Sequence, residues 1–195
     1  MHDDALFLAA RARFDALNSL DPELIGEVGL LRPKELVQAE RLEAWVLRLV
    51  LEPSLALRLA ARCQHLGRFR MPRSVYPEGR VAYLTWRKDL ARLHAQSAQE
   101  ILEQVGADPV LVAAVREINL KQDLKGKPDV QAMEDALCLS FLEHEFVPFV
   151  DRHEDDKVVD IVQKTWRKMS ERGHALALTL PLHGRALELI QRALR

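Results

Sequence analysis

A run of helical periodicity between residues 80 and 105 most constrains what this chain can fold into. Its apolar side chains recur every three or four residues, and Gly106 follows where a helix would end: Tyr83, Trp86, Leu90, Leu93, Ala98, Ile101 and Leu102. The same spacing predicts further helices over roughly residues 3–18, 33–49, 53–67, 108–118, 132–149, 155–173 and 181–194. No useful length of chain alternates apolar and polar residues as a half-buried strand does, so we predict an all-α fold.

The length and composition predict a single folded domain. The chain has 195 residues, which suits one compact helical domain over residues 1–195 with about seven to eight helices. Hydrophobic residues make up 48% of it, too many for a disordered chain. Proline and glycine interrupt the periodicity over residues 19–33 and 67–79, which we expect to be loops, with at most a short helical turn in the first.

The overall charge excludes a global electrostatic pull toward nucleic acid or anionic membranes, because the formal net charge is −1. Any anion site must therefore come from local clustering. Both cysteines, Cys63 and Cys138, lie in apolar helical patterns that indicate reduced, buried thiols. No apolar run approaches the roughly 20 residues that span a bilayer, so we expect a cytoplasmic protein with no membrane partner.

The segment CQHLGRFRMPR, residues 63–73, brings a histidine to the start of a basic run. Eight basic residues and two acids lie between Arg62 and Arg92, a local net charge of +6 in a nearly neutral chain. Arginine matches phosphate geometry, so Arg68, Arg70, Arg73 and Arg80 are predicted phosphate ligands. Aromatic residues within the segment would either stack on bases or pack in the core, and we favour the core for the last two: Phe69, Tyr76, Tyr83 and Trp86.

Each titratable candidate also has a structural interpretation. His65 ends an apolar helical pattern and would serve equally as a packed histidine with one ring nitrogen on a carbonyl. His94 lies two helical turns after Arg87 and would otherwise belong to a solvated basic face. Glu134 and Asp135 precede the apolar run ALCLSFL, where capping is the alternative to a chemical role. No pair of residues has the close spacing of a self-contained metal site, and no nucleotide-cofactor motif is present.

Several stretches together resemble a known family. They are QAERLEAWVLRL, LAARCQHLGRFRMPRSVYP, YLTWRKDLARLHAQSAQEILEQVG, MEDALCLSFLE and KTWRKMSERGHALAL. From about Pro33 onward the chain resembles the bacterial and fungal family called domain of unknown function 4202 (DUF4202). That family is distantly similar to the His-Asp (HD) superfamily of helical metal-dependent phosphohydrolases, so the resemblance implies an HD-domain-like fold.

The superfamily resemblance also implies a set of divalent-metal ligands, two of which are replaced. Gln38 stands at the position of the early histidine, and Leu66 replaces the central aspartate that follows His65. Asp135 matches the late aspartate, and His94 resembles an extra histidine of binuclear members. Leucine has no donor atom and glutamine is a weak neutral ligand. A reduced site would retain His65, His94, Asp135 and Glu40, with one coordination position open for hydrolysis.

Two functions follow from these observations. The first is a metal-dependent phosphohydrolase acting on a phosphate ester or nucleotide, with His65 and His94 as catalytic residues and the arginines stabilising the charge of the transition state. The second is a catalytically degenerate module that binds a phosphorylated ligand, or RNA, through a basic cleft. A helical interaction module without a small ligand is the remaining alternative.

Overall fold

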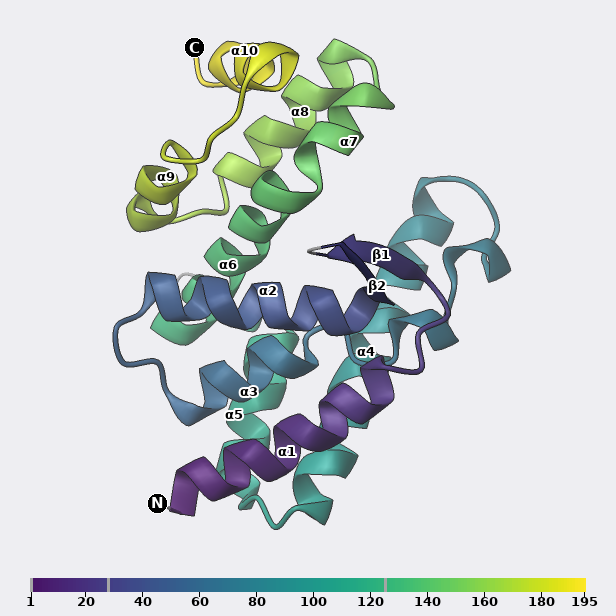
Figure 1. The fold of residues 1–195 in the computed structure, drawn as a ribbon, viewed down its shortest axis with the longest axis vertical. Helices are drawn as coiled ribbons and strands as arrows, with labels where there is room; N and C mark the ends of the chain where they lie inside the picture. The colour runs from purple at the N-terminus through teal and green to yellow at the C-terminus, as the bar shows by residue number, and fades with distance from the viewer. Residues whose placement is uncertain (1, 28, 125) are drawn as a thin grey trace.

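The computed structural model describes residues 2–27, 29–124 and 126–195 (Figure 1). Within these residues it has ten α-helices, two short 3₁₀ helices and one antiparallel hairpin. In chain order the elements are α1 (His2–Asn18), β1 (Leu24–Glu27), β2 (Leu30–Pro33), α2 (Lys34–Leu49), α3 (Leu55–Cys63), η1 (Arg68–Arg70), η2 (Arg73–Val75), α4 (Arg80–Gln104), α5 (Pro109–Asn119), α6 (Pro128–His144), α7 (Phe146–Asp151), α8 (Asp155–Trp166), α9 (Glu171–Ala177) and α10 (Gly184–Ala193). The all-α prediction is confirmed.

The main core lies between the first five helices and the N-terminal part of α6 (Figure 1). Seven of the nine residues of α3 are buried, and the helix packs against α1, α2, α5 and α6. Its first turn is capped by Ser54, whose hydroxyl accepts a hydrogen bond from the Leu57 N–H at 3.0 Å. Arg62, near the C-terminal end of α3, pairs with Asp15 of α1 and Glu43 of α2. One buried guanidinium therefore joins three helices.

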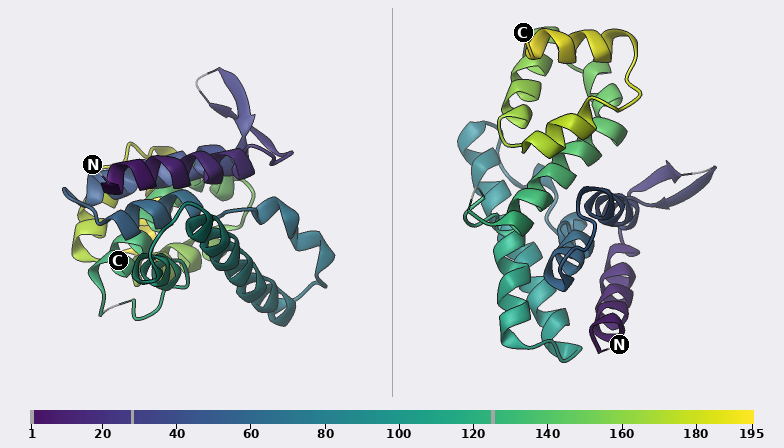
Figure 2. Two further views of the ribbon diagram at one scale, coloured as in Figure 1. Left: turned by 90° about the horizontal axis from the view of Figure 1, so that it is seen from below. Right: turned by 90° about the vertical axis from the view of Figure 1, so that its left-hand side faces the viewer.

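The last four helices, α7–α10, gather around the C-terminal part of α6 (Figures 1 and 2). Val150, Val158, Val162, Leu189 and Ile190 are buried there and belong to the same continuous core. Helix α6 therefore runs through both halves of the molecule. Figure 2 also shows that the β1–β2 hairpin and the N-terminal half of α4 project away from the packed helices.

The β1–β2 hairpin corrects one prediction, because residues 19–27 and 29–33 hold two strands, and no helix is present among them. Leu24 pairs with Pro33 and Glu27 pairs with Leu30. Gly29 has a φ of 80°, the left-handed conformation that a reversal here requires and that glycine adopts most readily. Four-residue strands are too short to show the alternation on which a strand prediction depends.

The helix boundaries correct three further predictions. The expected count of seven to eight is too low, because Glu145 separates α6 from α7 and residues 167–170 separate α8 from α9. Gly173 was expected to end or interrupt a helix, but it lies inside α9. Helix α3 ends at Cys63, four residues before Gly67, because residues 63–68 form tight turns in which Leu66 N–H donates to the Cys63 carbonyl at 3.1 Å. In the described part of the chain, no helix combines the length and apolarity needed to cross a bilayer.

Candidate functional site

His65 and His94 lie next to each other, as a shared site requires. Their ring centroids are 6.1 Å apart and the rings meet edge to face. His94 comes from the middle of α4 and is buried, and His65 is partly buried in the turn that follows α3. The Nδ1 atom of His65 is inaccessible to solvent and has no hydrogen-bond partner among the described residues. The two histidines thus form one side of a polar site in which the Nδ1 atom of His65 has no hydrogen-bond partner among the described residues.

Both imidazoles are neutral at neutral pH. Burial and, to a smaller extent, the charge of Arg68 lower the pKa of His94 to about 4, although its hydrogen bond to Leu66 opposes the shift. Burial also lowers the pKa of His65 well below its ordinary value, and the charges of Arg68, Lys121 and Arg87 add to that shift. His94 has its Nδ1 atom 2.8 Å from the Leu66 carbonyl oxygen. A carbonyl only accepts, so the Nδ1 atom carries the proton and Nε2 is left as the acceptor.

The charges of three cations from three different elements act on His65. Arg68 belongs to η1, Arg87 to α4, and Lys121 to the connection between α5 and α6. The Arg68 guanidinium lies 5.5 Å from the centre of the Trp86 ring, and its Nε atom lies 3.8 Å from a carboxylate oxygen of Glu35. We call His65, His94, Arg68, Arg87 and Lys121 the His65 site. Arginine and lysine side chains gathered in this way favour an anionic ligand.

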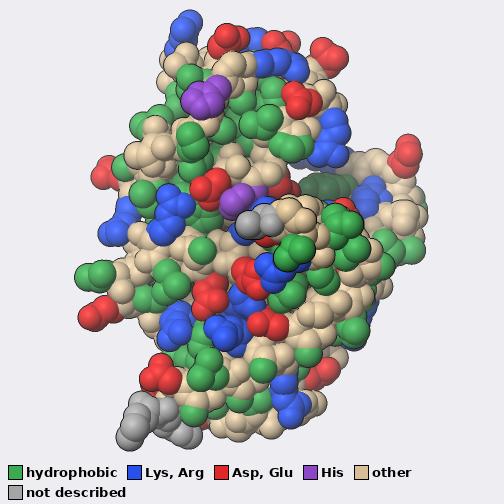
Figure 3. Space-filling model, viewed as in Figure 1, with side chains coloured by type: hydrophobic (Ala, Val, Ile, Leu, Met, Phe, Trp, Pro, Cys, Tyr) green, Lys and Arg blue, Asp and Glu red, His purple; other side chains and the backbone are tan. Residues whose placement is uncertain are grey.

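Of the three cations of the His65 site, Arg87 has the fewest interactions with the rest of the described chain. It is exposed, and among the described residues it forms no ion pair and no hydrogen bond. Figure 3 shows basic and acidic side chains intermixed over the face that it displays, in keeping with the net charge of −1. Since no acidic side chain of the described residues pairs with Arg87, its charge is available to a ligand.

Lys121 reaches the site from a strained backbone. Its φ is 55°, a left-handed conformation that costs a residue with a Cβ about 1–2 kcal/mol. The ammonium contacts the buried carboxylate of Glu134, and Lys168 approaches the other oxygen of that carboxylate at 3.5 Å. Burial raises the pKa of Glu134, but the two lysines outweigh it and the net shift is downward. Glu134 therefore holds Lys121 in place as a carboxylate.

Asp135 turns to the other side of α6 and ties it to α9. Its Oδ1 atom accepts from the Ser170 N–H at 2.8 Å, and its Oδ2 atom accepts from the Ser170 hydroxyl. Gln131 donates to Oδ1 at 3.1 Å. A Cβ placed on Gly173 would lie 2.8 Å from the same carboxylate oxygen. Asp135 is thus buried and engaged in holding the first turn of α9.

Glu40 also has a structural partner, because Arg32 of the hairpin binds its two carboxylate oxygens at 2.7 and 2.8 Å. Gln38 donates to Glu145, and the Leu66 side chain is buried in the core. No group of three or more His, Cys, Asp or Glu side chains in the described ranges is arranged to hold a metal ion. The predicted ligands do not fit a metal: His65 and His94 are together, while Asp135 and Glu40 are bound elsewhere.

The four predicted phosphate arginines are spread over the projecting part of the molecule. Arg68 alone belongs to the His65 site. Arg73 donates to the carbonyls of Tyr76 and Pro77, both at 2.8 Å, and so stabilises its own loop. Arg70 lies 5.8 Å from the centre of the Phe69 ring, in a cation–π contact. Arg80 lies roughly 21 Å from His94 along α4, since a helix rises about 1.5 Å per residue.

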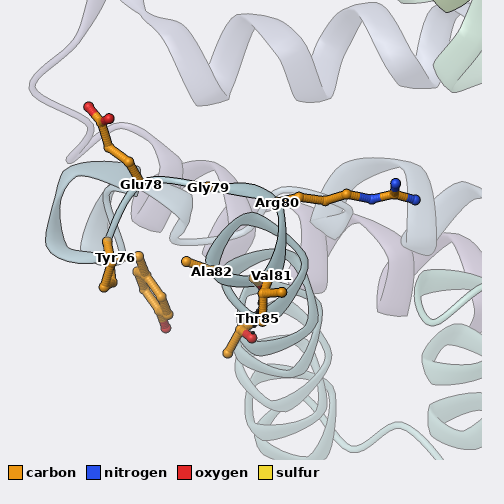
Figure 4. A pocket seen from close by; sticks show the side chains of 8 residues that line it. Tyr76, Glu78, Gly79, Arg80, Val81, Ala82 and Thr85 are labelled. Carbon is orange, nitrogen blue, oxygen red and sulfur yellow. Dashed lines mark hydrogen bonds between the residues drawn. The ribbon is translucent and has the colours of Figure 1, made fainter.

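A surface pocket of about 520 Å³ lies at the N-terminus of α4 and is lined by residues 76–82 and Thr85. Figure 4 shows that the Arg80 side chain points away from Tyr76 and Thr85. The pocket is therefore separate from the His65 site. Of the aromatic side chains here, Trp86 is buried and donates to the Met71 carbonyl at 3.0 Å, as the core prediction requires. Tyr83 is 43% exposed, so the core prediction is wrong for it.

Sequence reasoning did not assign Lys121 or Glu134 to the site with His65. Lys121 lies in a polar connection without periodicity, and only its backbone conformation brings it toward α6. Glu134 and Asp135 are adjacent, and a helix turns about 100° between neighbours, so the two carboxylates face different partners. The motif match chose Asp135, whereas Glu134 is the one that faces the lysine of the His65 site.

Comparisons with known proteins define the family. No curated protein and no solved structure matches the chain. The model of a domain of unknown function, DUF4202, matches residues 8–190. That match includes α2–α9 entirely, and so contains every residue of the His65 site. The chain therefore belongs to the DUF4202 family.

Proposed function

We propose that this protein binds a phosphorylated small molecule, a phosphate ester or nucleotide, at the His65 site. The observation that supports it most is the set of three cations around a neutral histidine that has a buried, unpartnered nitrogen. Charge-assisted hydrogen bonds from guanidinium and ammonium groups suit phosphate oxygens. Buried reduced thiols at Cys63 and Cys138 fit a cytoplasmic setting for such a ligand.

The test is calorimetric titration with inorganic phosphate, phosphate esters, nucleotides and short RNAs at two salt concentrations. Arg87→Ala is expected to weaken binding of the phosphates about tenfold, which corresponds to about 1.4 kcal/mol. Arg92→Ala is the matched control, since Arg92 is an exposed arginine of the same helix that already faces Asp89 at 3.5 Å. Equal effects of the two substitutions would count against the His65 site.

RNA binding through the basic segment is the alternative partner. It would appear as affinity for short RNAs, without affinity for small phosphates, and with a steep decline as salt rises. The separation of Arg68, Arg73 and Arg80 along the projecting loop and α4 suits a long backbone better than a single phosphate. The charges of three cations acting on one histidine with an unpartnered nitrogen are the reason that we favour the small molecule.

Hydrolysis of the bound phosphate ester is a second candidate function. The neutral pair His65 and His94 favours it, because the fixed tautomer of His94 leaves Nε2 as a proton acceptor. Release of inorganic phosphate would be measured with and without added divalent ions, since the HD superfamily resemblance stays a prediction. Turnover that is lost in His65→Ala would support hydrolysis, and binding without turnover in the unmodified protein would leave the binding function alone.

A further inference from the structure

Two buried polar side chains, one at the end of α1 and one at the start of α2, have hydrogen-bonding atoms without partners among the described residues. Asn18 is fully buried, and neither its Oδ1 nor its Nδ2 atom has a partner among the described residues. Glu35 is 3% exposed, and its Oε2 atom is likewise without a partner in that part of the chain. A buried polar group left unpaired costs about 1–3 kcal/mol. Native folds keep few such groups, and those they keep need a ligand or water to complete them.

These side chains meet at one junction of the fold. Asn18 ends α1 and Glu35 belongs to the first turn of α2. Asp21 connects them, because its N–H donates to the Asn18 carbonyl at 3.2 Å and its Oδ2 atom accepts from the Glu35 N–H at 3.1 Å. We call Asn18, Asp21 and Glu35 the Asn18 cluster. The groups of the cluster that still lack hydrogen-bond partners are the side-chain amide of Asn18 and one carboxyl oxygen of Glu35. Together they can both donate and accept hydrogen bonds.

Arg68 connects the Asn18 cluster to the His65 site. Its Nε atom lies 3.8 Å from Glu35 Oε1, and the same guanidinium lowers the pKa of both His65 and His94. Gly67, just before it, approaches α1, since a Cβ built there would lie 3.9 Å from a methyl group of Leu17. A ligand whose phosphate contacts Arg68 would therefore lie next to Glu35 of the Asn18 cluster.

We propose that the Asn18 cluster binds hydroxyl groups of the ligand whose phosphate occupies the His65 site, which makes that ligand a hydroxyl-bearing phosphate ester. This inference rests on the proposed function. Each ligand hydroxyl donates one hydrogen bond and accepts others, so it satisfies the Asn18 amide and the Glu35 oxygen together. Sites built around buried hydrogen-bonding groups discriminate strongly against analogues that lack the hydroxyl, because the groups of the protein are then left unpaired. The sugar of a free sugar phosphate and the ribose of a nucleotide share this chemistry.

Four probes separate the outcomes by calorimetric titration of the full chain: inorganic phosphate, phenyl phosphate, ribose 5-phosphate and adenosine monophosphate. We expect ribose 5-phosphate to bind at least about tenfold more tightly than phenyl phosphate, which has no hydroxyl group. Asn18→Leu, of similar size, is expected to abolish that preference while inorganic phosphate binds as before. Comparison of ribose 5-phosphate with adenosine monophosphate then distinguishes a sugar phosphate from a nucleotide as the source of the hydroxyls.

Two results would overturn the inference while leaving the proposed function intact. One is equal affinity for ribose 5-phosphate and phenyl phosphate, and the other is a preference that survives in Asn18→Leu; either means that the cluster holds water alone. If Asn18→Leu does not fold, as judged by circular dichroism, Glu35→Leu, which removes both carboxyl oxygens, takes its place and should also reduce the preference. Failure of all four probes to bind would instead remove the proposed function, and the inference with it.

Discussion

The imidazole of His94 donates its Nδ1–H to the main-chain carbonyl of Leu66, at 2.8 Å. The residue after His65 thus contributes to the site through its backbone, while its leucine side chain lies in the core. A carbonyl in this place fixes the tautomer of a histidine from another helix. It also joins α4 to the turn after α3, the two elements that carry most of the His65 site.

The buried state of His94 predicts a loss of stability in acid. The unfolded chain takes up a proton near pH 6.5 and the folded chain only near pH 4, so stability falls as the pH drops through that interval. His94→Asn retains an N–H donor but does not titrate. Relative to this variant, the native protein should lose about 3 kcal/mol of unfolding free energy between pH 6.5 and 4. Urea unfolding at a series of pH values measures the difference, and a constant difference would contradict burial of His94 as the cause.

Glu35 predicts the opposite dependence on pH. Burial raises its pKa to about 7, and the nearby Asp21 adds to the rise while Arg68 opposes it. Its contribution to stability is thus fully present below about pH 4.5 and is lost as the pH rises through 7. Between pH 4 and 8, the unfolding free energy of Glu35→Gln should rise relative to that of the native protein by on the order of 3 kcal/mol. Thermal or urea unfolding of both proteins across that range measures the difference in unfolding free energy. A variant that loses stability relative to the native protein as the pH rises would contradict the prediction.

The ion triad of Arg62 predicts a large cost for its removal. Arg62 is 3% exposed and pairs with Asp15 and Glu43, so Arg62→Leu leaves two carboxylates without their shared cation. We expect a loss of about 3–5 kcal/mol of unfolding free energy. Arg92→Leu, an exposed arginine, should change it by less than about 0.5 kcal/mol. Similar values for both variants in urea unfolding would show that the triad contributes no more than a surface pair.

The close approach of Gly173 to Asp135 predicts that even one methyl group is too large there. Gly173→Ala would place its Cβ 2.8 Å from the Asp135 carboxylate and should cost about 1–3 kcal/mol. Gly26→Ala is the control, because a Cβ at Gly26 meets nothing within 4 Å. The clash also predicts coupling: in an Asp135→Ala background the second substitution should cost less. Additive losses in this double-mutant cycle would place the strain elsewhere.

The long helices could be predicted from the sequence because their periodicity is strong. The helix predicted over residues 80–105 is α4 within one residue, and the first predicted helix ends at Asn18 as observed. The hairpin could not be predicted, because its strands are four residues long and Leu24, Leu30 and Leu31 are exposed. The hairpin is stabilised by ion pairs from Arg32 to Glu40 and from Glu27 to Arg41 of α2, contacts between residues that no local pattern relates.

Only part of the candidate site could be predicted, for a related reason. His65 and His94 were found together because a motif names both. Asn18 and Glu35 have ordinary helix-end positions in the sequence, where a cap or a dipole contact explains them. Their burial comes from the meeting of α1, α2 and the turn after α3, which only the fold reveals. Lys121 could not be assigned to the site for the same reason, because it lies in a polar connection without periodicity.

Helix α6 sets a geometric condition on the fold of this protein. Glu134 anchors the lysine of the N-terminal half, and Asp135, the next residue, anchors Ser170 of the C-terminal half. One residue added to α6 between Asp135 and His144 would turn α7 and everything after it by about 100° and move it about 1.5 Å along the axis. Ser170 could then no longer meet Asp135. The length of α6 is therefore fixed by the angle between its two ends. The fold can accept insertions and deletions in the loops around α6 but not within the helix.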